Sequence, residues 1–440
     1  MFTPLVFHAY MCEFRLERSF MTGAEFSRGR GWFVAVVATL AMSVSYVDRQ
    51  ALAALAPTVK DALHINHTQY GWLTSAFSMT YLVGAPLAGL VVDRIGARRG
   101  LAYAVVAWTC VAAGHALVPT FGALFALRIA LGLTESPSFP GAAQAVKRSH
   151  HGRDREAGFG MLFTGSSIGA MIAGPAAIAL KVHYGWQRAF VGVALLGALW
   201  IPLWLVASGG PMRKVLSQGA DSPDASTIGQ SLAEIPKLLG KVGVVRALLL
   251  VFGSAPAIMF VLNWFPQYLE ARHHIPQDDL GHYVWFPPLL FDLGAVGFGV
   301  LAGRLAPARR ERGPTVLVAL AGVLASTIAL SPLAPDAASA TLLAGVSLSG
   351  GGALFALLTA DMLARVEPRL VSRAGGLTAA AQSLVYIVAN PIVGKVIDRT
   401  HDYRSVTVAL GLLVVPGVLA WIALGRADSR AAWRMDPRLE

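Results

Sequence analysis

Twelve long apolar stretches run along this sequence of 440 residues, separated by shorter polar segments. A helix that crosses a lipid bilayer needs about 20 mostly apolar residues, and each stretch is long enough to supply one. The widest polar segment divides the stretches into two sets of six. We assign the stretches to 32–56, 69–92, 100–118, 120–145, 157–180, 189–207, 246–270, 280–303, 315–331, 338–362, 374–396 and 405–425.

The composition is typical of a membrane protein. Hydrophobic residues make up 55% of the chain and charged residues 14%, whereas a soluble domain carries about 25% charged residues. Such low charge also excludes a disordered chain. The net charge of +11 does not indicate a nucleic-acid partner, because membrane proteins gather Lys and Arg on their cytoplasmic side. We therefore predict an all-α membrane protein that contacts the lipid bilayer and no nucleic acid.

The positions of the 36 Lys and Arg residues orient the chain. When the N-terminus is assigned to the cytoplasm, the large majority of them fall in cytoplasmic segments. We therefore predict twelve transmembrane helices with both termini in the cytoplasm, built as two repeated halves as in many secondary transporters. The start carries no signal peptide, and Met21 is an alternative first residue. The predicted organisation is a tail over 1–31, a six-helix bundle over 32–207, a cytoplasmic loop over 208–245, a second six-helix bundle over 246–425 and a tail over 426–440.

Neither metal chemistry nor enzyme chemistry is indicated. The two cysteines, Cys12 and Cys110, are far apart and lack a metal-binding pattern. His64 and His67 have i,i+3 spacing but no third ligand, so we interpret them as solvated loop residues and expect no metal site. No catalytic residue, ATP-binding motif or soluble output domain is present, which disfavours an enzyme or a sensor. Transport would then need no cofactor beyond an ion gradient.

Four charged residues interrupt the apolar stretches of the first half: Asp48 and Arg49 in 32–56, and Arg128 and Glu135 in 120–145. Ionisable side chains inside a membrane are costly and indicate function. The four charges sum to zero, which suggests mutual neutralisation. Protonation of a carboxylate would free a guanidinium, and that guanidinium could then bind an anion. The alternative is an ion-pair cluster that only holds the helices together.

Residues 89–99 read Gly-Leu-Val-Val-Asp-Arg-Ile-Gly-Ala-Arg-Arg, a short basic loop between two predicted helices. Gly96 permits a tight turn, and Gly89 permits close helix approach. The loop resembles the signature G-x-x-x-D-R-x-G-R-R of the major facilitator superfamily. The resemblance implies that the loop gates the cytoplasmic side by latching the two halves together. The matching residues are Gly89, Asp93, Arg94, Gly96 and Arg98.

Further segments resemble the anion:cation symporter branch of that superfamily, and especially its bacterial hexuronate and galactonate carriers. These segments are Ser45-Tyr46-Val47-Asp48-Arg49-Gln50, Leu55-Ala56-Pro57-Thr58, Ser75-Ala76-Phe77 with Tyr81, Arg128, Gly132 and Glu135 with Phe139-Pro140, Tyr184-Gly185-Trp186-Gln187-Arg188-Ala189-Phe190, Asn263-Trp264-Phe265-Pro266-Gln267-Tyr268-Leu269 and Asp292-Leu293-Gly294.

The resemblance implies that Arg49 binds the substrate carboxylate and that Tyr46 and Tyr81 line the site. A phenol suits a polyol acid, because it combines an apolar ring with a hydrogen-bonding hydroxyl. Ser166 is a further predicted substrate-binding residue. Galactonate carriers have Gln there, and the shorter Ser leaves room for a larger or cyclic ligand or for a water, so the substrate here is left open. Three further residues have two equally good interpretations: they bind hydroxyls of the substrate, or they form hydrogen bonds between helices. These residues are Asn263, Gln382 and Asn390.

The resemblance also implies that Asp48 and Glu135 bind the transported proton, with Arg128 as their partner. We predict proton-coupled uptake of a small organic anion, and the favoured substrate is a sugar acid such as a hexuronate or aldonate. The predicted carrier is a monomer in the bacterial inner membrane. The alternatives are a carrier for another carboxylate (aldarate, aromatic or dicarboxylic acid) and a drug or metabolite efflux antiporter. Asp292 and Asp361 have two interpretations, a place on the proton path or a helix-end or interfacial role.

Overall fold

The computed structural model describes residues 27–218, 235–304, 313–367 and 370–435. Within these ranges the chain forms helices joined by short turns, with no strand. Eleven of the helices are long and apolar enough to cross a membrane. Most of the predicted N-terminal tail, part of the central loop, the end of the C-terminal tail and Met21 lie outside the described residues.

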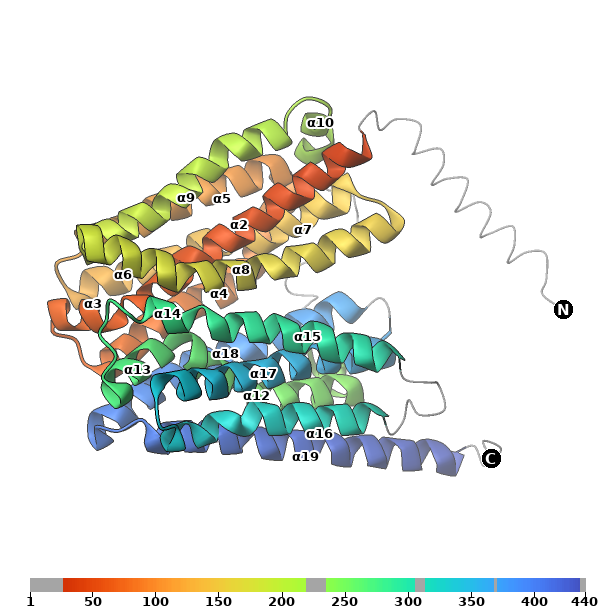
Figure 1. Cartoon of the computed structure of the whole chain (residues 1–440). Coiled ribbons are helices and arrows are strands. Elements are labelled where there is room, and N and C mark those ends of the chain that lie inside the picture. The colour runs from red at the N-terminus through yellow and green to blue at the C-terminus, as the bar shows by residue number, and fades with distance from the viewer. Residues whose placement is uncertain (1–26, 219–234, 305–312, 368–369, 436–440) are drawn as a thin grey trace.

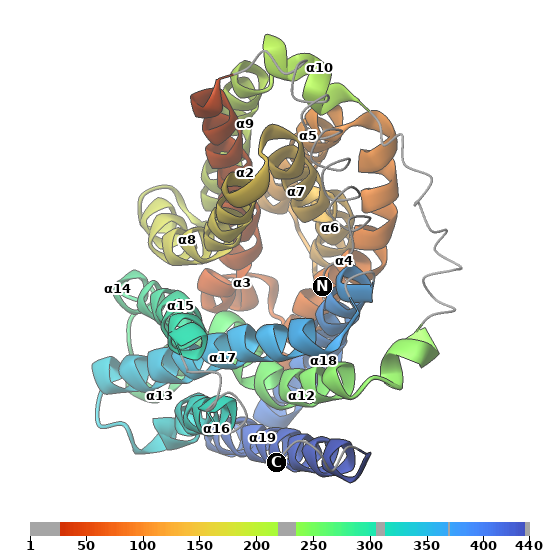
Figure 2. The ribbon, with the colours of Figure 1, turned by 90° about the vertical axis from the view of Figure 1, so that its right-hand side faces the viewer.

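The helices form two groups that follow the order of the chain (Figures 1 and 2). The first group is α2 (Arg28–Ala54), α3 (Ala56–Leu63), α4 (His67–Ile95), α5 (Ala97–Gly114), η1 (His115–Leu117), α6 (Phe121–Glu135), α7 (Ser138–Ser149), α8 (Gly152–Tyr184), α9 (Trp186–Ala207) and α10 (Pro211–Ser217). The second is α12 (Val242–Asn263), α13 (Phe265–His273), α14 (Gly281–Val284), α15 (Phe286–Arg304), α16 (Gly313–Ser326), η3 (Thr327–Leu333), α17 (Ala337–Arg365), α18 (Val371–Thr400) and α19 (Arg404–Met435).

Several predicted stretches are divided by a break near proline. The stretch 120–145 becomes α6 and α7, because Pro137 has no N–H to donate to a carbonyl of the preceding turn. For this reason neither piece is long enough to be a candidate span by itself. The same effect separates α12 from α13 before Pro266, and α14 from α15 before Pro287.

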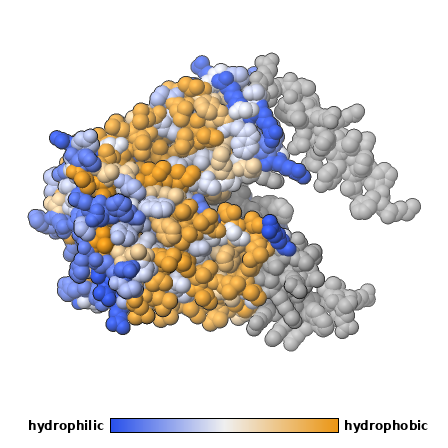
Figure 3. All heavy atoms as spheres, viewed as in Figure 1, coloured by the Kyte–Doolittle hydropathy of each residue, from blue (hydrophilic) through white to orange (hydrophobic). Residues whose placement is uncertain are grey.

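The outer surface of both groups carries a broad apolar band. Figure 3 shows this band across the helices, with hydrophilic residues at the left end and at the upper right. Large side chains in the band, such as Val83, Leu199 and Val323, are more than half exposed. Soluble proteins rarely expose contiguous apolar patches of this size. The chain is therefore a multi-pass membrane protein whose apolar band faces lipid.

The two groups touch at the end that carries α3 and α13 and part towards the end that carries α10. In Figure 1, α8 and α15 lie close together at the left and diverge to the right. At the closed end, Gly71 of α4 packs against the backbone of Asn390, and Gly394 of α18 packs against the backbone of His67. Any larger residue at either glycine would push α4 and α18 apart.

Candidate functional site

Three residues of the first group form a buried polar contact between α2 and α6. The Ser45 hydroxyl donates to Oε2 of Glu135 at 2.8 Å, and Nη2 of Arg49 donates to the same oxygen at 3.1 Å. Glu135 is fully buried, whereas the Arg49 side chain is 18% exposed. One turn separates Ser45 from Arg49, so both reach the carboxylate from one face of α2. Arg49 is thus held by a carboxylate while remaining open to a ligand.

Aromatic rings surround the Arg49 guanidinium. Its Cζ lies 4.5 Å from the ring centre of Tyr46, 4.5 Å from that of Phe77 and 4.9 Å from that of Tyr81. The Phe77 and Tyr81 rings stack on each other. Rings at these distances stabilise a cation and exclude water from it. An anion that binds Arg49 would therefore meet a desolvated charge and two phenols.

Asp48 lies next to Arg49 in the chain but turns into the protein. It is 4% exposed, and neither of its oxygens hydrogen-bonds to a residue that the structure describes. Burying an ionised carboxylate without hydrogen bonds is costly. The two predicted proton sites, Asp48 and Glu135, are therefore both buried. Of the two, only Glu135 has hydrogen-bonded partners among the described residues.

Among the contacts of the described residues, Arg128, the predicted partner of the two carboxylates, bonds directly to neither of them. Arg128 is 3% exposed, its Nε donates to the carbonyl of Leu73 at 3.5 Å, and its guanidinium faces the Phe77 ring at 5.1 Å. Among the described residues, the ion pair of this cluster joins Glu135 to Arg49 instead. The Phe77 ring therefore contacts both guanidiniums.

The second group contributes amides that bond to each other. Nδ2 of Asn263 donates to Oδ1 of Asn390 at 3.3 Å, and Nε1 of Trp264 donates to the same oxygen at 2.9 Å. Asn390 is fully buried and donates to the Tyr386 carbonyl. In this conformation Asn263 and Asn390 act as interhelical ties. Gln382 donates to the Tyr386 hydroxyl at 3.4 Å and remains half-buried.

Ser166 of α8 is half-buried and bonds to its own helix. Its hydroxyl donates to the Phe163 carbonyl of its own helix at 2.7 Å. The next residue, Ser167, crosses the boundary and donates to Oδ1 of Asp292 on α15 at 2.7 Å. Asp292 therefore lies at the interface between the two groups, which is one of its two predicted roles.

Asp361 accepts instead from Nε of Arg365 at 2.9 Å and lies 3.2 Å from Nε of Arg246.

Most of the predicted gating loop is helical, because α4 continues to Ile95 and α5 begins at Ala97. Asp93 accepts from Nε2 of Gln144 on α7 at 2.7 Å, and Nε of Arg98 donates to the Ser208 carbonyl at 3.2 Å. Gly96 has φ +82°, a value that favours glycine.

Three features of this loop differ from the predicted latch. Arg94 is exposed, and nothing lies within 4 Å of where a Cβ on Gly89 would stand. The close helix approach expected at Gly89 is therefore wrong for this conformation. The described polar contacts of Asp93 and Arg98 also stay within the first group, so this loop does not latch the halves here.

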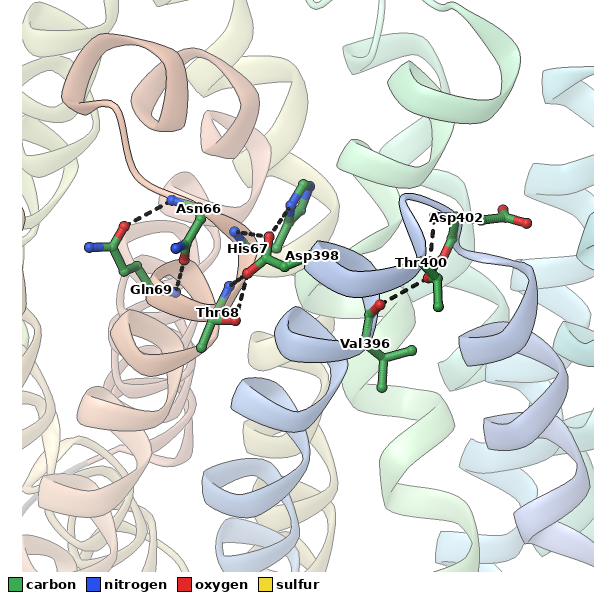
Figure 4. Close-up of polar contacts among 8 residues, drawn as sticks. All are labelled: Asn66, His67, Thr68, Gln69, Val396, Asp398, Thr400 and Asp402. Atoms are coloured by element: carbon green, nitrogen blue, oxygen red, sulfur yellow. Dashed lines mark hydrogen bonds and ion pairs between the residues drawn. The ribbon is translucent and has the colours of Figure 1, made fainter.

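The contact at the opposite end of the molecule joins the groups firmly. Asp398 of α18 accepts from the backbone N–H of His67 at 3.0 Å and from that of Thr68 at 2.8 Å, at the start of α4 (Figure 4). The Thr68 hydroxyl and the His67 ring also contact the carboxylate, at 2.6 Å and 2.8 Å. A carboxylate at a helix N-terminus satisfies free N–H groups and the helix dipole. His67 is therefore not the solvated residue that we predicted.

Sequence reasoning missed four residues of these contacts: Ser45, Phe77, Tyr386 and Asp398. The i,i+4 spacing of Ser45 and Arg49 was a usable signal, because these residues share a face of one helix. Phe77 is apolar, and only its position between two guanidiniums reveals its role. Nothing local to Asp398 points to a partner 331 residues away. Within the described ranges, no three His, Cys, Asp or Glu side chains come together to hold a metal ion.

Chemically, the site can bind a carboxylate at Arg49, because a guanidinium forms two parallel hydrogen bonds with one. Glu135 occupies that position in this structure. An incoming anion and Glu135 would therefore compete for the same guanidinium. A proton on Glu135 would remove its charge and weaken its hold on Arg49.

Comparisons with known proteins identify the family of this chain. The sequence profile of the Major Facilitator Superfamily matches residues 38–387. The chain is 28% identical over 419 residues to the hexuronate transporter of Escherichia coli (strain K12), covering 90% of this chain and 94% of that protein. It is 24% identical over 420 residues to a probable galactarate/D-glucarate transporter of Bacillus subtilis (strain 168), covering 89% and 91%.

Among solved structures, a bacterial homolog of the human lysosomal transporter Spinster is similar in fold. That structure is inward-facing and unoccupied, and it matches with a TM-score of 0.73 at 15% identity, covering 91% of this chain and 98% of the other. The likeness concerns the arrangement of helices alone.

Proposed function

The chain belongs to the Major Facilitator Superfamily, and from this premise we propose that it carries a sugar acid, a hexuronate or an aldonate, together with a proton into the cell. The relatives named for hexuronate and for galactarate/D-glucarate transport support a sugar-acid substrate. The proposal covers a monomer in the bacterial inner membrane, with twelve spans in two six-helix bundles that alternate access to one site.

The observation that carries the proposal is the geometry at Arg49. A guanidinium lies within the candidate span α2, ringed by Tyr46, Phe77 and Tyr81, and paired with a buried carboxylate. Its partial exposure leaves it open to an anion. A pump for apolar compounds would gain nothing from such a charge, which costs energy to bury. The geometry therefore favours anion uptake over drug efflux.

The same contacts support proton coupling. In the proposed cycle, a proton neutralises Glu135, Arg49 releases it, and the substrate carboxylate takes its place. The Ser45 hydroxyl can either donate to a charged Glu135 or accept from a protonated one. Asp48 is the second proposed proton site, since it is buried beside Arg49 with no hydrogen-bonded partner among the described residues. Arg49 stays charged throughout, so the carboxylates act as the switch.

We assign the end that carries α3 and α13 to the outside and α10 to the cytoplasm. The contact of Asp398 with α4 would then close the outer side, and the loop at Asp93 and Arg98 would be disengaged on the inner side. This is the arrangement expected for a carrier open to the cytoplasm. It gives the two ends opposite roles, as alternating access requires.

Uptake by purified protein in liposomes tests the proposal. Labelled galacturonate should accumulate when the outside is more acidic than the inside, and a protonophore should abolish the accumulation. Aldonates, aldarates and aromatic acids serve as competitors, and protein-free liposomes serve as the control. No uptake of any sugar acid, or extrusion of apolar dyes in its place, would overturn the proposed function.

A further inference from the structure

A third carboxylate lies near the proposed substrate site, and the proton-coupling mechanism does not use it. Asp292 is a half-buried residue of α15 in the second half of the chain. Its Oδ1 accepts a hydrogen bond of 2.7 Å from Ser167 on α8 in the first half. Ser167 adjoins Ser166, a predicted substrate residue. The carboxylate thus reaches across the boundary between the halves.

Two sets of contacts connect Asp292 with the Arg49 site. Gly169, two residues beyond Ser167, is packed against Tyr46, where a Cβ would lie 2.7 Å from the Tyr46 Cβ. Tyr46 in turn stacks against Arg49. One turn before Asp292, Pro288 lines a small cavity together with Gln50, the neighbour of Arg49. Asp292 therefore lies one turn from a cavity that also borders α2, the helix that carries Tyr46 and Arg49.

The partner of Asp292 differs in kind from that of Glu135. Glu135 pairs with a guanidinium, whereas no cation pairs with Asp292 among the described residues. Its observed partner is a hydroxyl. A carboxylate held by a hydroxyl alone is chemically suited to accept from other hydroxyls. The halves must separate here when the site opens to the other side, and Ser167 would then release the carboxylate.

We propose that Asp292 determines substrate specificity by accepting hydroxyls at the end of the sugar acid opposite its carboxylate, and by repelling a second carboxylate at that end. The inference rests on the proposed function and deepens it, because it selects hexuronates and aldonates over aldarates. Arg49 binds the acid end and Asp292 the polyol end. An aldarate would bring like charges together at Asp292, an arrangement that disfavours binding.

Competition in proteoliposomes tests this assignment. Galactarate and galactonate are compared as inhibitors of labelled galacturonate uptake by the unmodified protein and by Asp292→Asn, Asp292→Ser and Ser167→Ala. The unmodified protein should prefer galactonate over galactarate by about tenfold or more. Both Asp292 variants should bind galactarate more tightly and galactonate less tightly, which brings the two inhibition constants to within about threefold. Ser167→Ala removes the tie between the halves but keeps the carboxylate, so its preference should stay that of the unmodified protein.

The outcomes separate this inference from the proposed function. If galacturonate is carried but the Asp292 variants keep the original preference, the specificity role is wrong. A preference lost equally in Ser167→Ala would assign the effect to the tie between helices and overturn the inference as well. If the unmodified protein carries no sugar acid, the proposed function and this inference both fail.

Discussion

Arg49 is the residue on which the account depends. Its guanidinium stays charged at any physiological pH, so the protein controls it by changing its partner. Glu135 pairs with it and is itself bonded to Ser45. The rings of Tyr46, Phe77 and Tyr81 pack around it. A ligand that replaces Glu135 therefore meets a guanidinium whose position is already fixed, which lowers the cost of binding.

Replacing Arg49 with Ala should abolish anion binding. Removing one partner of a buried charge pair costs about 2–5 kcal/mol, which corresponds to a loss of affinity of roughly 30-fold or more. Arg49→Lys keeps the charge but cannot form the bidentate hydrogen bonds of a guanidinium, so its affinity for the anion should be intermediate. Calorimetry with galacturonate on detergent-solubilised protein measures this. Arg188→Ala, which removes an exposed Arg far from the site, is the matched control. An unchanged affinity in Arg49→Ala would move the carboxylate site elsewhere.

Sequence reasoning located the four charges of the first half, because charge inside an apolar stretch is conspicuous. It did not give their pairing. The expected partner of the carboxylates was Arg128, but Arg49 reaches Glu135 while Arg128 faces Phe77. Pairing depends on how α2, α4 and α6 rotate against one another, and single-helix periodicity contains no such information.

At the scale of elements, the positions of long apolar helices can be predicted from the sequence, whereas the breaks within them are harder to predict. Eleven of the twelve predicted stretches correspond to candidate spans among the described residues, since a backbone in lipid must satisfy its own hydrogen bonds. The break between α6 and α7 follows from Pro137, which had been included in one continuous span. Contacts between helices could not be predicted, because a contact such as that between α4 and α18 joins residues more than three hundred positions apart.

The carboxylate of Asp398 at the start of α4 should stabilise the closed outer side. Asp398→Asn removes the charge that faces four donors of α4. Losing a hydrogen bond to a charged group costs about 1.5–3 kcal/mol, so the open population should rise roughly tenfold or more. A cysteine at Ala53, which lies buried in the small cavity between the halves, reports opening through its labelling from outside, with Cys12 and Cys110 replaced by Ser.

Asp402→Asn is the matched control for this experiment. Asp402 lies just beyond the end of α18, where its Oδ1 accepts from the Arg404 backbone N–H (Figure 4 shows Asp398 and Asp402). Its variant should label like the unmodified protein. Equal labelling rates in Asp398→Asn and the unmodified protein would show that the α4 contact does not hold the outer side closed.

At the scale of the whole molecule, the two halves meet at one end and part at the other. The apolar band of Figure 3 requires both halves to lie side by side in one bilayer. The positive charge that favours the α10 end for the cytoplasm was visible in the sequence, whereas the conformational state was not. Which end is closed depends on contacts such as Asp398 with His67 and Ser167 with Asp292, which form only between halves.

Lys60 offers a direct test of orientation. It lies in α3, between candidate spans, and burial lowers the pKa of its ammonium to about 8. About half of Lys60 is therefore the reactive free amine at pH 8. A membrane-impermeant amine reagent applied to intact cells at pH 8 should label Lys60, as read by mass spectrometry. Lys214, exposed on α10, should be labelled only after the membrane is opened. The reverse pattern would invert the assigned topology.

The central claim is that a proton on Glu135 frees Arg49 for the substrate. Its most direct test is to measure proton movement when galacturonate is added outside de-energised proteoliposomes. The unmodified protein should make the outside more alkaline as the anion enters. Glu135→Gln mimics the protonated acid, so it should exchange labelled galacturonate across the membrane without moving protons. If Glu135→Gln moves protons with the substrate as the unmodified protein does, Glu135 is not the coupling site and the account is wrong.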